Sequence, residues 1–290
     1  MPNKQSSAEG TPFLLRIARG TRHLDSFRGL TILQRIYRKV LPHDTAYRIG
    51  DFDGDLLLDV NVRECVGVNL WHAPEQYERE ERRRFCSEIR PGTTVLDVGA
   101  NIGIFTLLAA KRGARVFAIE ADPYNARILR RHVELNGFSG QVTVIEMAAV
   151  ETPGMVQLYR NESNRGGNSL YGEGVPIGVA GKTVDSLDLP PIDVCKIDIE
   201  GAEIPALRGM TETLRRSPNM KMLVECSDAF GKDRATELLR LVKQAFSRIS
   251  IVEGGMASAE TLPSYCNLWC TDPLREKPAP SAPSALQPQS

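Results

Sequence analysis

Three acidic side chains stand where two predicted strands end, and their carboxylates are suited to accept a proton. Asp198 and Glu200 lie at the end of the segment "DVCKIDIE", and Glu225 lies at the end of "KMLVEC". Because parallel strands end at the same edge of a sheet, we expect the three carboxylates on one rim. A carboxylate in a cleft can take the proton of an acceptor hydroxyl. Asp198, Glu200 and Glu225 are therefore our candidate catalytic residues.

The strand that carries Asp198 is unusually polar. Lys196, Asp198 and Glu200 alternate with apolar residues and so share one face of the strand. A buried unpaired charge is costly, so these side chains must pair with each other or face a cleft. A purely structural Lys196–Asp198 pair is the alternative interpretation. Two acids can also hold a divalent cation, but no Asp-Asn pair or His cluster completes a ligand set, and we expect no metal.

A second candidate site is the segment "VLDVGANIG", residues 95–103, in which an apolar strand runs into a turn with two glycines. Its G-x-x-x-G spacing matches neither the dinucleotide pattern G-x-G-x-x-G nor a P-loop. The glycines permit a close approach of backbone and ligand, and the next helix presents unpaired N–H groups. The candidate binding residues are Asp97, Gly99, Ala100, Asn101 and Gly103.

Glu120 follows this turn by about twenty residues, where a Rossmann-like site places an acid on ribose hydroxyls. The expected ligand therefore carries a ribose but no phosphate, a description that S-adenosylmethionine meets. Its carboxylate is expected at N–H groups near Gly99. Its adenine is expected in an apolar slot formed by Met147 and Ala148, with Ala121 beside Glu120. Ordinary turn glycines and a solvated strand-end acid are the alternative interpretation.

The elements that must position these residues alternate between strand and helix from residue 94 to about 272. This pattern predicts an α/β, Rossmann-like, doubly wound and mostly parallel sheet. Only the short segment 254–264 separates the last two strands, which predicts an antiparallel last strand. The helix after the acidic strand is expected at 202–215.

The N-terminal part is expected to be an extension of helices and a hairpin. Residues 13–41 are basic and predict one or two helices, with a weak contact to a membrane surface as one reading. Residues 47–70 are predicted as strands that turn at Asp53-Gly54. We divide the chain into a disordered segment 1–12, an extension 13–90, a ligand-binding domain 91–272 and a disordered Pro-rich tail 273–290.

Composition narrows the class of protein. The 36 Lys and Arg residues balance the 36 Asp and Glu residues, so no global field favours nucleic acid as a partner. No apolar run reaches the ~18 residues that a membrane helix needs, and the polar start lacks the apolar stretch of a signal peptide. Scattered cysteines fit reduced thiols, so we expect a cytoplasmic protein.

Longer segments resemble a known family. "VLDVGANIGIFTLLAAKRGARVFAIEADPYNARILRRHVELNG" and "KTVDSLDLPPIDVCKIDIEGAEIPALRGM" are similar to two motifs of FkbM-type methyltransferases, and "QYERE" resembles the motif before them. The resemblance implies a class I methyltransferase fold, S-adenosylmethionine as cofactor and usually O-methylation. It also implies that Tyr77 and Glu78 belong to the cofactor site and that Glu203 belongs to the acidic motif.

The expected function is therefore S-adenosylmethionine-dependent methyl transfer, with a small-molecule or glycan hydroxyl as the acceptor. The alternative is an N-methyltransferase acting on RNA or another amine. The glycine-rich insert 150–185 is a candidate cover for the substrate. Trp71 and His72 are candidates for sugar stacking and for a second base, although packing in the interior is the favoured interpretation of both.

Overall fold

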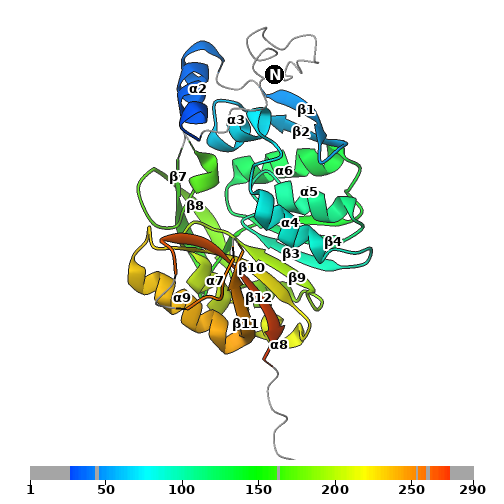
Figure 1. The fold of residues 1–290 in the computed structure, drawn as a ribbon, viewed down its shortest axis with the longest axis vertical. Coiled ribbons are helices and arrows are strands. Elements are labelled where there is room, and N and C mark those ends of the chain that lie inside the picture. Colours follow the sequence, from blue (N-terminus) through cyan, green and yellow to red (C-terminus); the bar gives the residue numbers. More distant parts are fainter. Residues whose placement is uncertain (1–26, 43–45, 162–163, 253, 259–261, 275–290) are drawn as a thin grey trace, which may run out of the picture.

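A seven-stranded sheet forms the centre of the protein (Figure 1). The computed structural model describes residues 27–42, 46–161, 164–252, 254–258 and 262–274. The strands are β3 (Thr94–Val98), β4 (Arg115–Glu120), β5 (Val142–Glu146), β9 (Val194–Ile197), β10 (Lys221–Ser227), β11 (Phe246–Ile251) and β12 (Tyr265–Pro273). Their order across the sheet is β11-β12-β10-β9-β3-β4-β5. In this sheet β12 alone runs in the direction opposite to the other six strands. This confirms the predicted topology and the antiparallel last strand.

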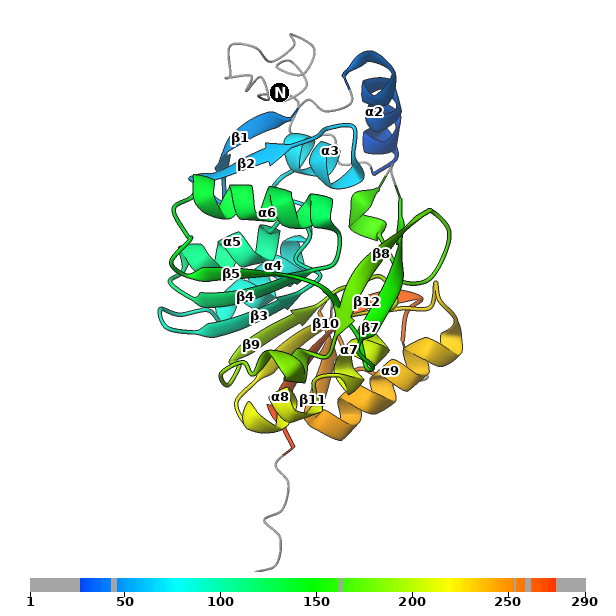
Figure 2. The same ribbon diagram turned by 180° about the vertical axis from the view of Figure 1, so that it is seen from behind.

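Helices cover both faces of the sheet, and a separate apolar core lies under each layer (Figure 2). One layer contains α4 (Arg79–Ser87), α5 (Ile104–Lys111) and α6 (Pro123–Leu135), and the other contains α7 (Glu203–Arg208), α8 (Thr211–Arg216) and α9 (Lys232–Ala245). Side chains of β3 alternate between the two cores: Val95 joins the first, and Leu96 and Val98 join the second. The central strands are therefore buried on both faces, as parallel strands must be.

The strand order reverses beside β3. From β3 the chain passes to β4 and β5 on one side, whereas β9 and β10 lie on the other side. In open α/β sheets, ligands bind outside the carboxyl ends of the strands at such a reversal. The glycine turn after β3 and the acids after β9 both lie at this edge.

The N-terminal hairpin is confirmed, with β1 (Tyr47–Phe52) pairing antiparallel to β2 (Leu56–Val60). The predicted strands did not continue to residue 70, because Cys65–His72 forms helix α3. A short apolar run fits a buried strand and a buried helix equally well, which explains this error. The hairpin is fixed to α6 by Asn136, whose side-chain amide bonds the backbone N–H and carbonyl of Leu57 at 2.8 and 2.9 Å.

Helix α2 (Phe27–Val40) lies beside α3 and is one continuous helix. Its buried side is anchored by Tyr37, whose hydroxyl lies 3.0 Å from His72 Nε2. The same helix exposes Ile32, Ile36 and Val40. In the described part of the chain no helix is long and apolar enough to cross a membrane. Contact of α2 with a membrane surface stays a prediction, and the segments 1–12 and 275–290 lie outside the described residues.

An insert forms a second, three-stranded sheet at the carboxyl edge of the main sheet (Figure 2). It consists of β6 (Ala148–Ala149), β7 (Gly154–Arg160) and β8 (Val175–Lys182), with the single turns η2 (Arg165–Gly167) and η3 (Val184–Leu187). The helix predicted at 202–215 is divided into α7 and α8. Gly209 lies at the division, where a Cβ atom would stand 2.2 Å from the carbonyl oxygen of Val150.

Candidate functional site

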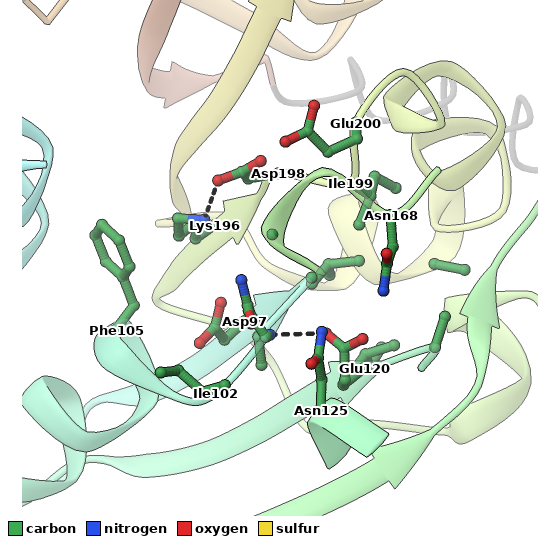
Figure 3. Close-up of a pocket in the computed structure, with 18 of the residues that line it drawn as sticks. Asp97, Ile102, Phe105, Glu120, Asn125, Asn168, Lys196, Asp198, Ile199 and Glu200 are labelled. Carbon is green, nitrogen blue, oxygen red and sulfur yellow. Dashed lines mark hydrogen bonds and ion pairs between the residues drawn. The ribbon is translucent and has the colours of Figure 1, made fainter. Parts of the chain in front are cut away.

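A cavity opens at the carboxyl ends of β3, β4 and β9 (Figure 3). The insert and the loop before α4 complete its wall. Of the predicted site residues, it is lined by Tyr77, Glu78, Asp97, Gly99, Ala100, Asn101, Glu120, Ala121, Met147, Ala148, Asp198 and Glu200. Gly103 and Glu225 do not line it. Gly103 instead faces α6, where an added Cβ would lie 2.4 Å from Leu129 Cδ1.

The backbone N–H groups of the glycine turn fix it to the end of β4. The N–H groups of Gly99 and Ala100 both donate to the carbonyl of Ile119 at 2.9 Å, and the N–H of Asn101 donates to Glu120 Oε2 at 2.7 Å. The sequence predicted that N–H groups near Gly99 bind a ligand carboxylate. That assignment is wrong for these three groups because each already has an acceptor.

Glu120 is buried at the end of β4 and accepts hydrogen bonds on both oxygens. Oε1 accepts the N–H of Asp122 at 2.8 Å, and Oε2 accepts the N–H of Asn101. Burial raises the pKa of Glu120 to about 7, against the effect of these two bonds. Each oxygen keeps a second lone pair, so the carboxylate can still accept ribose hydroxyls from the cavity.

Asp97 supplies a second polar group to the cavity. Its Oδ2 accepts a hydrogen bond of 2.6 Å from the hydroxyl of Thr106, while its Oδ1 is buried and has no partner among the described residues. Burial raises the pKa of Asp97, and the nearby ammonium of Lys196 opposes that shift. An unpaired acceptor of this kind suits a ligand ammonium group.

Apolar side chains form the slot predicted after the third strand. Met147 and Ala148 are almost fully buried and line the cavity beside Ala121. Leu158 and Leu170 of the insert extend the same wall. These two leucines could not be predicted, because only the pairing of the insert brings them to the edge of the main sheet.

The three candidate catalytic acids come together, and we call Asp198, Glu200 and Glu225 the acid cup. One carboxylate oxygen from each lies within 4.8 Å of the others. Asp198 and Glu200 are partly exposed and line the cavity, whereas Glu225 is 7% exposed and lies behind Asp198 on β10. The three acids therefore lie together at one rim, as predicted, but only Asp198 and Glu200 line the cavity.

Lys196 connects the acid cup to Asp97. Its ammonium lies 2.7 Å from Asp198 Oδ2 and 4.7 Å from the centre of the Phe105 ring. Burial alone would raise the pKa of Asp198, but the charge of Lys196 and a hydrogen bond from Glu225 together outweigh it and hold that pKa below its usual value. The structural pair considered from the sequence is therefore present, and it is also part of the cavity wall.

The turn that carries Glu200 is strained and braced. Glu200 has a φ of 52°, in the left-handed region that non-glycine residues rarely adopt. Glu203 stabilises the turn, because its Oε1 accepts the N–H groups of Ile199 and Gly201, both at 3.1 Å. Asn101 and Glu78, at φ values of 51° and 46°, also line the cavity. Such strain often accumulates at functional sites.

Tyr77 and Glu78, which were expected at the cofactor site from the family resemblance, lie in the cavity wall. Burial raises the pKa of Glu78, and the charge of Lys196 opposes the shift. Trp71 and His72 are buried among the residues of the N-terminal extension and do not line the cavity. Packing is therefore the correct interpretation of both.

The insert also brings two polar side chains to the cavity, those of Arg165 and Asn168. The amide nitrogen of Asn168 donates to Asp122 Oδ2 at 2.8 Å, next to Glu120. The hydroxyl of Ser169 donates to the backbone carbonyl of Glu200. The insert therefore touches both the turn after β4 and the turn after β9, and it spans the two ends of the cavity.

These residues fit S-adenosylmethionine. The unpaired Oδ1 of Asp97 suits the ammonium of its methionine part, Glu120 suits the ribose hydroxyls, and the slot at Met147 and Ala148 suits the adenine. Asn125 adds a second unpaired oxygen, its Oδ1, near Glu120. Figure 3 shows Glu120 and Asn125 at one end of the cavity, and Asp198 and Glu200 at the other.

Comparison with protein families gives one match. The family described as "Methyltransferase FkbM domain" matches residues 97–248, a little more than half of the chain. The matched range begins at Asp97, includes Glu120 and the acid cup, and ends in β11.

Similar proteins include several methyltransferases. Ribosomal protein L11 methyltransferase from Pelotomaculum thermopropionicum is 30% identical over 130 residues, which are 39% of this chain and 42% of that protein. Arginine N(omega)-methyltransferase from Streptomyces achromogenes subsp. streptozoticus is 43% identical over 83 residues, which are 27% of this chain and 23% of that protein. The solved structure of methyltransferase FkbM from Methylobacillus flagellatus KT is 18% identical with a TM-score of 0.42, covering 70% of this chain and 54% of that one. The matches span less than half of the length of the two curated relatives.

Proposed function

The chain belongs to the FkbM methyltransferase family, and from this premise we propose that it transfers a methyl group from S-adenosylmethionine to a hydroxyl oxygen of a sugar, a glycan or another natural product. The observation that carries the proposal is the position of Asp198 and Glu200. Both line the cavity at the end opposite Glu120. If Glu120 binds the ribose, these two acids face the part of the cavity left for the acceptor.

The chemistry follows from the residues at that end. S-adenosylmethionine supplies a methyl group on a positively charged sulfur, which is reactive without further activation. Lys196 and a hydrogen bond from Glu225 lower the pKa of Asp198, so its carboxylate is ionised and can accept the proton of a bound hydroxyl. The surrounding turns fix the acceptor relative to the cofactor pocket, and such positioning supplies much of the rate in a two-substrate reaction.

A second candidate function is methylation of a cationic nitrogen, such as an amine or a guanidinium. It is favoured by the surplus of carboxylates in the acid cup, which would bind a positively charged acceptor. The similarity to an arginine methyltransferase over 83 residues adds support. A bound cation would still have to lose a proton before its nitrogen could attack.

The test is transfer of labelled methyl groups from S-adenosylmethionine to matched acceptors. Polyols, oligosaccharides and phenols form one panel, and amines and guanidines form the other, with mass spectrometry locating the new methyl group. The main proposal expects label on oxygen, and loss of that label in Asp198→Asn. Label found only on nitrogen would contradict O-methylation and support the second function, methylation of a nitrogen.

A further inference from the structure

The spacing of the acid cup is that of ligands around one metal ion. One oxygen each from Asp198, Glu200 and Glu225 lies within 4.8 Å of the others. Oxygens that bind one Ca²⁺ at 2.3–2.6 Å can lie at most about 5 Å apart, since the ion sits between them. The three side chains need little movement to share such an ion.

Glu225 provides an independent indication of a ligand. It is 7% exposed, on a strand paired with both β9 and β12. Its Oε2 is buried and has no hydrogen-bond partner in the described part of the chain. A buried carboxylate oxygen without a donor is costly, and a cation in the cup would satisfy it.

The charges of the cup point to a divalent ion. Three carboxylates meet one ammonium, that of Lys196, which pairs with Asp198 Oδ2. The sum of these four charges is −2 when all are ionised. Without an ion, burial and the charge of Asp198 raise the pKa of Glu225 to about 11 and keep that carboxyl protonated. The pair with Lys196 involves Oδ2 of Asp198, and Asp198 also shares a hydrogen bond with Glu225, so an ion between these two carboxylates would take the place of the shared proton.

We propose that Asp198, Glu200 and Glu225 bind a divalent cation at the acceptor end of the cavity. The ligands are all carboxylate oxygens, which suit Mg²⁺, Mn²⁺ or Ca²⁺. Asp198 is 29% exposed toward the cavity, so water or an acceptor oxygen can complete the coordination. The sequence argued against a metal because no ligand set was apparent, and the structure supplies the third ligand by placing Glu225 beside Asp198.

The role of the ion rests on the proposed function. A hydroxyl bound to a divalent cation has a lower pKa, and its proton passes more readily to a neighbouring base or to water. The binding of the ion can be tested without any assumption about the acceptor. Relief of the crowded negative charge by a proton shared between Asp198 and Glu225 is the competing explanation.

The experiment is calorimetric titration of the chelator-treated full chain with MgCl₂, MnCl₂ and CaCl₂, each with and without S-adenosylhomocysteine. We expect one saturable site per chain for at least one ion, with a Kd below about 1 mM. Glu225→Gln keeps the shape but removes a charge, and it should weaken the ion at least about tenfold. Glu200→Gln, at a partly exposed position, should also weaken binding of the ion at least about tenfold. The matched control is Glu212→Gln, which removes an exposed acid paired with Arg215 and should leave binding unchanged.

The outcomes separate this proposal from the proposed function. No saturable binding of any of the three ions, with S-adenosylhomocysteine still bound, would overturn the metal site and favour the shared proton. Ion binding that is unchanged in both cup variants would also overturn it. Failure of the wild-type chain to bind S-adenosylhomocysteine would instead contradict the methyltransferase function, whatever the ions do.

Discussion

Gly99 lies so close to Asp198 that a Cβ atom on the glycine would stand 1.8 Å from the carbonyl oxygen of the aspartate. The N–H of Asp198 also donates to the carbonyl of Val98 at 3.0 Å. The turn after β3 and the end of β9 therefore touch through their backbones. This contact fixes the position of the acid cup relative to the turn that borders the cofactor pocket.

Gly99→Ala should disrupt both the fold and the cofactor pocket. The substitution combines a clash at 1.8 Å with a φ of +83°. We expect a loss of more than about 3 kcal/mol in the free energy of unfolding and loss of S-adenosylhomocysteine binding. Chemical denaturation and calorimetry measure the two effects.

Gly92→Ala is the matched control for the backbone conformation. Gly92 has a nearly equal φ of +87°, but nothing lies within 4 Å of an added Cβ. It should cost only about 1 kcal/mol and leave cofactor binding intact. Equal losses in the two variants would show that conformation, and not the contact with Asp198, determines the effect.

Asp198→Asn should reduce turnover while cofactor binding is kept. The variant loses the carboxylate that lines the cavity and pairs with Lys196, and loss of a general base costs about 100-fold or more. Steady-state kinetics measure the turnover, and a calorimetric titration with S-adenosylhomocysteine measures cofactor binding. Asp188→Asn, at an exposed surface pair with Arg216, is the control. Full turnover in Asp198→Asn would remove this residue from the mechanism.

Glu64 makes stability depend on pH. Burial raises its pKa from 4.5 to about 7, although the charge of Arg165 opposes the shift. The folded state therefore holds this proton more tightly than the unfolded chain does. The resulting stabilisation is complete below about pH 4.5 and is lost as the pH rises through about 7.

Glu64→Gln has no titrating group at this position. The free energy of unfolding of the wild type should therefore fall relative to that of the variant as the pH rises from 4.5 to 8. The expected change in the difference is at most about 3 kcal/mol, since each pKa unit corresponds to about 1.4 kcal/mol. Denaturant unfolding at several pH values measures it, with the exposed Glu173→Gln as control. A difference that stays constant over this range would contradict the assigned shift.

Much of the main sheet could be predicted because its signals are local. Strand–helix alternation, the glycine turn and the polar strand at Lys196 each lie within one short segment. They led to the parallel sheet, to Glu120 beside the turn and to Asp198 and Glu200 in one cavity. Where periodicity was ambiguous, as at Cys65–His72, the prediction was wrong.

The remaining features depend on contacts between distant segments. Leu158 and Leu170 reach the cavity only because the insert pairs into its own sheet. Glu225 lies behind Asp198 because β10 pairs with β9 in a register that the sequence does not reveal. The N–H groups of Gly99 and Ala100 looked available, but the carbonyl of Ile119 on β4 accepts both.

Glu120→Gln should weaken the cofactor site selectively. The amide keeps the size of the side chain but has one acceptor oxygen in place of two, and it cannot serve Asn101, Asp122 and the ribose together. We expect at least about tenfold weaker binding of S-adenosylhomocysteine. Glu146→Gln, at the register-paired position on β5, should bind as the wild type does. Because Glu120 has a pKa of about 7, wild-type affinity should also fall as the pH drops below that value.

Calorimetric titration of the wild-type chain with S-adenosylhomocysteine at pH 8 tests the cofactor site most directly. We predict saturable binding of one molecule per chain, weakened in Glu120→Gln and unchanged in Glu146→Gln. No binding to the wild-type chain, or equal affinity in Glu120→Gln, would contradict the assignment of this cavity as the cofactor site.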